Sequence, residues 1–97
     1  MDEELRKKYG RRADLVKAMA HPTRLFLVDK LSEKEYCVQE LTAMVGDDIS
    51  TVSKHLSVLK QAGVLQSQKR ANCVYYSLKC PCVMKFFSCV EGMVEGT

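Results

Sequence analysis

Residues 38–63 of the chain read VQELTAMVGDDISTVSKHLSVLKQAG. Apolar residues recur at helical spacing on both sides of the turn Gly46-Asp47-Asp48, in which the glycine is a natural helix terminator and Asp48 a good N-cap. After the turn, Val52, Leu56 and Leu59 form an apolar stripe at i, i+4 and i+7. Two helices joined by about three residues that include glycine predict a helix-turn-helix.

Two more helices are expected upstream of this motif. Apolar residues recur at helical spacing from Leu5 to Ala20 among lysines and arginines, which predicts a basic amphipathic helix that ends near Ala20. His21-Pro22-Thr23 interrupts the pattern, and the proline suits the first turn of a second helix. The apolar residues of that helix run from Leu25 to Leu31, and we expect it to stop by Ser32.

Downstream of Gly63 the pattern changes to that of strands. Residues 64–68 and 73–78 predict two β-strands, because the second contains Val74, Tyr75 and Tyr76, which have high β-propensity. Lys69-Arg70-Ala71-Asn72 is expected to be the loop between them. A short β-hairpin with a basic tip, next to a helix-turn-helix, predicts a wing.

A last helix is expected to open at Pro81 and is apolar over a wide arc. Its two neighbouring apolar stripes are Val83, Phe87, Val90 and Val94, and Cys82, Phe86, Cys89 and Met93. Such a helix is usually buried against another element, and a chain of 97 residues has a modest core. We therefore expect a homodimer formed through the first and last helices.

The sequence as a whole predicts a mainly α-helical fold with a small β-hairpin (α+β). The element order is ααααββα, in a single winged helix-turn-helix domain over residues 1–97. Apolar residues make up 46% and charged residues 28%, an ordinary globular balance. No apolar run approaches the roughly 18 residues of a membrane span, and the acidic start Met1-Asp2-Glu3-Glu4 lacks the apolar segment of a secretory signal. We expect a cytoplasmic protein with no membrane partner.

Charge is unevenly distributed along the chain. From Ile49 to Val90 there is no Asp or Glu, although the net charge of the whole chain is only +3. The same stretch holds Lys54, Lys60, Lys69, Arg70, Lys79 and Lys85. Such a one-signed segment indicates a polyanionic partner, most simply nucleic acid, and the alternative is a solvated basic surface.

The second helix of the helix-turn-helix holds the candidate DNA contacts. Small polar and basic side chains are needed at its N-terminal end, because that end enters the major groove. The candidates are Ser50, Thr51, Ser53 and Lys54 there, His55 and Lys60 further along, and Arg70 and Asn72 at the wing tip. For Lys60 we expect a contact to the DNA backbone. For His55 a structural hydrogen bond is favoured over a DNA contact. The alternative for the whole motif is a helix-turn-helix that binds protein.

These motifs together resemble the ArsR/SmtB repressors over about Leu5 to Leu78. The resemblance is carried by residues 20–24 (AHPTR), 50–56 (STVSKHL), 59–65 (LKQAGVL) and 74–78 (VYYSL). It implies a homodimeric repressor that leaves its operator when it senses a metal, a metalloid or an oxidant. The family's zinc site of His and Asp/Glu on the last helix is absent here, because His21 and His55 both lie elsewhere. Of the two cysteines in the family's Glu-Leu-Cys-Val-Cys-Asp-Leu type motif, only the first is present, as Cys37, because Gln39 replaces the second.

Three of the five cysteines lie close together near the C-terminal end. An odd number of cysteines argues against a structural disulfide framework. Cys80, Cys82 and Cys89 suit As(III), Sb(III) or a soft ion such as Cd(II), Pb(II) or Cu(I). Cys82 and Cys89 would lie about 10.5 Å apart along one straight helix, too far for a shared ligand. A bend at Pro81 would bring Cys80 and Cys82 together, or Cys89 of the partner subunit would complete the site.

The other interpretation of these cysteines is a redox sensor. With Pro81 as the first helical residue, Cys80 is a candidate N-cap whose thiolate the helix N-terminus would stabilise. A disulfide would then contain Cys80, or would join Cys82 to Cys89 of the partner subunit. Cys37 is either an accessory ligand or, as we favour, a small buried residue, and Cys73 has a structural role. The alternative without a sensing role is that all the cysteines pack as small apolar residues.

An enzyme is not expected. Cys80-Pro81-Cys82 resembles a redox-catalytic pair, but no βαβ pattern accompanies it and no His, Ser or acidic group is placed to act as a base. No obligatory cofactor is expected either, and As(III)/Sb(III) or a soft metal ion would act as an effector.

Overall fold

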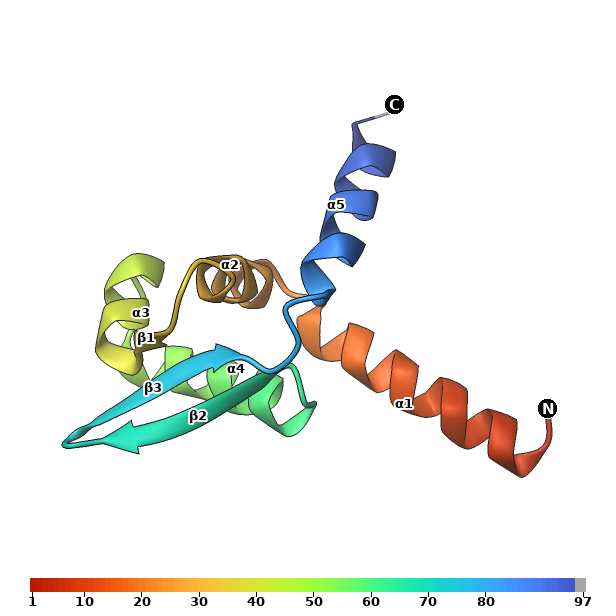
Figure 1. Cartoon of the computed structure of the whole chain (residues 1–97), viewed down its shortest axis with the longest axis horizontal. Coiled ribbons are helices and arrows are strands. Elements are labelled where there is room, and N and C mark those ends of the chain that lie inside the picture. The colour runs from red at the N-terminus through yellow and green to blue at the C-terminus, as the bar shows by residue number, and fades with distance from the viewer. Residues whose placement is uncertain (96–97) are drawn as a thin grey trace.

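The structure is a computed structural model that describes residues 1–95, within which the chain forms five helices and three strands (Figure 1). In chain order these are α1 (Glu3–Met19), α2 (Pro22–Leu31), β1 (Tyr36–Cys37), α3 (Val38–Val45), α4 (Ile49–Gln61), β2 (Leu65–Arg70), β3 (Cys73–Leu78) and α5 (Val83–Val94). The predicted winged helix-turn-helix is confirmed.

The core is built from the apolar stripes of α2, α3 and α4 and one face of the sheet. Its fully buried side chains are Leu27, Val28, Leu41, Val52, Leu56, Leu59 and Leu65. Burial of each such side chain contributes roughly 1.5–3 kcal/mol. Because the whole predicted stripe of α4 is buried, the opposite face of α4 must point to solvent.

The turn between α3 and α4 has the caps that the sequence predicts. Gly46 ends α3 with a left-handed backbone (φ 80°), a conformation that strains other residues. Asp48 Oδ1 accepts a hydrogen bond of 2.8 Å from the backbone N–H of Thr51. Hydrogen bonds from the Thr51 side chain and backbone hold the pKa of Asp48 below its ordinary value. These caps fix where α4 begins.

The sheet is larger than the sequence predicts. The strand order is β1-β3-β2, and β1 adds the antiparallel pairs Tyr36↔Tyr76 and Cys37↔Tyr75 to the hairpin. The first strand of the hairpin was expected over 64–68 but runs from Leu65 to Arg70, because the pairing with β3 continues to Arg70↔Cys73. The tip is therefore only Ala71-Asn72, in which Ala71 has a positive φ of 55°.

The start of the last helix also differs from the prediction. Helix α5 begins at Val83 rather than Pro81, and its N-cap is Cys82 rather than Cys80. Cys80 and Cys82 form a disulfide across Pro81. The first two N–H groups of α5, those of Val83 and Met84, donate to the carbonyl oxygens of Cys80 and Pro81, three residues back in this tight loop. The bend at Pro81, one of the two alternatives left open by the sequence, brings Cys80 and Cys82 together, and Cys80 does not cap α5.

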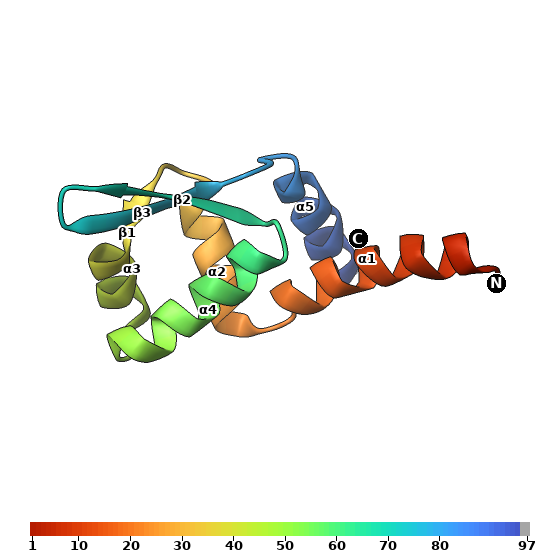
Figure 2. The same cartoon turned by 90° about the horizontal axis from the view of Figure 1, so that it is seen from below.

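Helices α1 and α5 project from the core, and the wing extends from the other end of the molecule (Figures 1 and 2). Residues 3–17 of α1 are exposed, and α5 contains no buried residue. Their exposed large apolar side chains are Leu5, Tyr9, Leu15, Val16, Phe86, Val90, Met93 and Val94. No helix within residues 1–95 is long and apolar enough to cross a membrane.

Candidate nucleic-acid interface and thiol site

The N-terminal end of α4 presents the predicted polar residues on its outer face. Ser50 and Lys54 are exposed, and Thr51 and Ser53 are half-buried. Because Val52 and Leu56 anchor the opposite face in the core, these four side chains lie around the free end of the helix. Asp48 accepts a hydrogen bond from the N–H of Thr51, and the N-terminal end of a helix carries the partial positive charge that attracts phosphate oxygens. Lys60 is exposed in the last turn of the same helix.

His55 has an intramolecular partner. Its Nδ1 accepts a hydrogen bond of 3.1 Å from Arg24 Nε, and its ring centroid lies 4.6 Å from that of His21. Arg24 also donates to the carbonyl oxygen of Ala18 at 3.2 Å. His21 caps α2 by accepting a hydrogen bond from the N–H of Thr23. These contacts tie α4 to α2 and to the end of α1, which agrees with the structural hydrogen bond favoured for His55.

The His55 cluster predicts a pH dependence of stability. Burial, followed by the charges of His21 and Arg24, lowers the pKa of His55 below its ordinary value of 6.5, while Asp47 acts in the opposite direction. Between the lowered pKa and 6.5 the unfolded chain binds more protons than the folded one, so stability rises with pH there. This contribution is complete above about pH 6.5 and is lost as pH falls through the lowered pKa of the folded protein.

We expect urea unfolding to give a lower free energy of unfolding at pH 5.5 than at pH 7.5. The carboxylates with lowered pKa, Glu35, Glu40 and Asp48, lose their contributions only in more acidic solution. In His55→Gln the difference between the two pH values should shrink. An equal difference in both proteins would show that another group is responsible.

Both predicted contacts of the wing, Arg70 and Asn72, are exposed, but the guanidinium of Arg70 has a partner within the protein. Its guanidinium forms a two-point ion pair with the carboxylate of Glu35, from the segment before β1. Sequence reasoning missed Glu35 because no local pattern connects it to the hairpin. It missed Arg24 as the partner of His55, although both lie in the stretches that carry the family resemblance.

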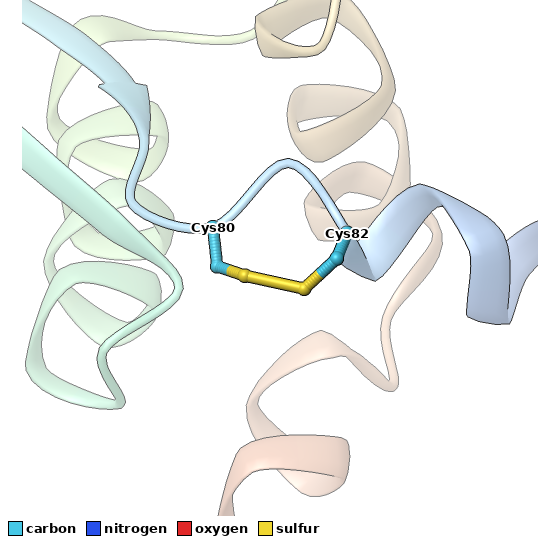
Figure 3. The surroundings of a disulfide bond; sticks show 2 residues. All are labelled: Cys80 and Cys82. Carbon is cyan, nitrogen blue, oxygen red and sulfur yellow. A yellow bond between two sulfur atoms is a disulfide. The ribbon is translucent and has the colours of Figure 1, made fainter.

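The five cysteines are not gathered into one site. Cys80 and Cys82 form the disulfide that bridges the loop before α5 (Figure 3), with their Cα atoms 5.4 Å apart. Cys89 is free and exposed on α5, Cys37 is free and buried, and Cys73 is free and half-buried. No group of three or more His, Cys, Asp or Glu side chains in the described residues 1–95 could hold a metal ion. The predicted three-sulfur set is therefore incomplete within one subunit.

An apolar cavity of about 350 Å³ adjoins the disulfide, between α1 and the start of α5. It is lined by Leu15, Val16, Met19, Gly63, Val64, Cys80, Cys82, Val83 and Phe86. The two bridged cysteines thus contact the region where the exposed apolar faces of α1 and α5 meet. The disulfide therefore lies next to the junction of these two helices.

Comparisons with known proteins identify the family and the fold. The family model described as "Bacterial regulatory protein, arsR family" matches residues 21–67. The biofilm growth-associated repressor of Xylella fastidiosa (strain Temecula1) is 34% identical over 76 residues, which are 78% of this chain and 67% of that protein. The crystal structure of NolR from Sinorhizobium fredii has a TM-score of 0.85 at 30% identity and covers 100% of this chain and 96% of its own.

A further solved structure supports the fold alone. It is the homodimeric winged helix-turn-helix DNA-binding domain of a possible ArsR-family transcriptional regulator from Mycobacterium bovis. Its TM-score is 0.86 at 23% identity, over 98% of this chain and 88% of that one. The relatives and the fold are those of DNA-binding transcriptional regulators and not of enzymes.

Proposed function

Because the chain belongs to the ArsR family of bacterial regulatory proteins, we propose that it represses transcription by binding an operator in double-stranded DNA as a homodimer. The N-terminal end of α4 enters the major groove, and the wing tip reaches the neighbouring backbone or minor groove. The observation that carries this proposal is the free end of α4, where Ser50, Ser53 and Lys54 stand around the helix N-terminus. No carboxylate follows in the sequence until after Val90.

Lys54→Ala tests the DNA-binding face. Loss of this charge should weaken binding by roughly 1 kcal/mol or more and should reduce the slope of log affinity against log salt by about 1. The measurement is fluorescence anisotropy on a labelled duplex from upstream of the protein's own gene, at several salt concentrations. Lys30→Ala is the matched control, because it removes the same charge from a lysine that is already paired with Glu33 at 3.7 Å. Unchanged affinity and slope in Lys54→Ala would exclude this face.

The homodimer is proposed to form through α1 and α5. Phe86 is 49% exposed and Met93 is 79% exposed in the single chain. Exposed apolar patches of this kind on a small domain mark protein interfaces. Two subunits related by a two-fold axis would present two copies of α4 to two half-sites, so the packing of α5 sets the spacing of the recognition helices.

The effector is proposed to act on Cys80 and Cys82. The disulfide between them supports control by oxidation, in which two thiols and one molecule of peroxide yield the disulfide and two molecules of water. Oxidation closes the loop between β3 and α5 and changes how α5 packs. The oxidised dimer then favours a spacing that no longer fits two half-sites, and the operator is released.

As(III)/Sb(III) or a soft metal ion is the second candidate effector. The observation that favours it is the short separation of Cys80 and Cys82, whose Cα atoms lie 5.4 Å apart. After reduction, both sulfur atoms would be available to one soft ion. A third sulfur would have to come from the partner's Cys89, because the described part of one subunit does not supply a group of three ligands.

A further inference from the structure

Glu35 holds the guanidinium of Arg70 at the end of the wing. Arg70 Nη1 donates to Glu35 Oε1, and Nη2 donates to Glu35 Oε2 at 3.1 Å. The same Nη2 donates to Gln68 Oε1 at 2.9 Å, and the guanidinium carbon lies 5.0 Å from the centroid of the Tyr75 ring. Three side chains from three segments thus surround one positive charge of the proposed DNA-binding surface.

The register of the sheet explains why these groups meet. Tyr75 on the central strand β3 pairs with Gln68 of β2 on one side and with Cys37 of β1 on the other. Paired residues lie on the same face of a sheet, and so do residues two apart along a strand. Arg70 is two residues beyond Gln68, and Glu35 two residues before Cys37. Glu35, next to the edge strand β1, and Arg70, on the other edge strand β2, therefore lie on the same face of the sheet, with Tyr75 of β3 between them.

The ion pair between Glu35 and Arg70 neutralises a positive charge on the wing, where the proposed function uses positive charge to bind DNA. The hydrogen bonds from Arg70 hold the pKa of Glu35 below its ordinary value, so this carboxylate is ionised at neutral pH. A carboxylate presents two oxygens to a guanidinium in the same fork geometry as a phosphate group. The side chains of Arg70 and Glu35 are 45% and 43% exposed. A DNA phosphate can therefore approach, and an ion pair this exposed is weak.

We propose that Glu35 is an internal competitor with DNA for Arg70. In the free protein the carboxylate of Glu35 occupies the edge of the guanidinium that binds a phosphate, and on DNA it competes with the phosphate for that edge. Glu35 thereby lowers the affinity of the wing for any phosphate backbone. This inference rests on the proposed DNA-binding function, and it identifies a residue that lowers the affinity for DNA.

Glu35→Gln is the test, measured as anisotropy on the same upstream duplex at several salt concentrations. Release of Arg70 to one phosphate should tighten binding about threefold to tenfold and should steepen the salt slope by about 0.9. Glu33→Gln is the matched control: it removes the same charge from the same segment, but Glu33 pairs with Lys30 rather than with the wing. In an Arg70→Gln background, Glu35→Gln should give no more tightening than the Glu33 control.

The outcomes separate this inference from the proposed function. Wild-type protein that does not bind duplex DNA overturns both. Wild-type protein that binds, together with Glu35→Gln that matches Glu33→Gln in affinity and slope, overturns the competitor role only. Weaker binding by Glu35→Gln, with an unchanged thermal unfolding midpoint, also overturns it, because Glu35 would then be holding Arg70 in its binding position.

Discussion

Replacing Phe86 by glutamate is expected to convert the dimer into a folded monomer and to abolish tight operator binding. Phe86 lies at the junction of α1 and α5, where it lines the apolar cavity with Val16 and Met19. In the proposed dimer the new carboxylate would be buried without a partner, at a cost of roughly 3–5 kcal/mol. Dimerisation should therefore weaken by at least about 100-fold. A monomer engages one half-site only, so the affinity for the whole operator falls with it.

The variant should remain folded, because Phe86 is half-exposed and is not one of the side chains packed against the core. Far-UV circular dichroism checks this point, and analytical ultracentrifugation measures the dimer. Ser88→Glu is the matched control. At 100° per residue Ser88 lies about 200° around the helix from Phe86, on the polar side, and it is exposed. If Phe86→Glu dimerises as tightly as the wild type, α5 is not the interface.

The helix ends and the turn between α3 and α4 could be predicted because short stretches of sequence determine them. Gly46 and Asp48 fix the turn of the helix-turn-helix, and Pro22 stands at the start of α2 as expected. The buried stripe of α4 follows from the spacing of its apolar residues alone, and the polar side chains at the N-terminal end of α4 remain accessible to solvent. Each of these features needs only a few neighbouring residues, so no long-range contact has to be known.

The missed features depend on contacts between distant segments. Strand β1 has two residues, too few for a periodic pattern, and it exists because β3 offers an open edge. The Glu35–Arg70 pair joins residues 35 positions apart and needs the order of all three strands. Similarly, the partner of His55 lies 31 positions away on α2. Helix α5 starts at Val83 and not at the predicted Pro81, because the Cys80–Cys82 disulfide, rather than backbone propensity, shapes the loop before it.

The second large effect concerns the thiols. In wild-type protein that has been reduced and bound to its operator duplex, peroxide should form the Cys80–Cys82 disulfide and release the DNA. Cys80→Ser lacks one of the two sulfur atoms and should stay bound at peroxide concentrations that release the wild type completely. Its affinity in the reduced state should be unchanged, because Cys80 is remote from the exposed N-terminal end of α4. Anisotropy under anaerobic conditions, followed by addition of peroxide, measures both quantities.

Cys89→Ser separates the two candidate effectors. Cys89 is free, so a mechanism based on the Cys80–Cys82 disulfide predicts a normal response of Cys89→Ser to peroxide. A three-sulfur site for As(III) or Sb(III) predicts instead that both Cys89→Ser and Cys80→Ser lose release by arsenite, with about one metalloid per subunit in the wild type. Release of Cys80→Ser by peroxide would remove the disulfide from the mechanism. Control would then have to be sought at a disulfide between Cys82 and Cys89 of the partner subunit, or at the other free thiols, Cys37 and Cys73.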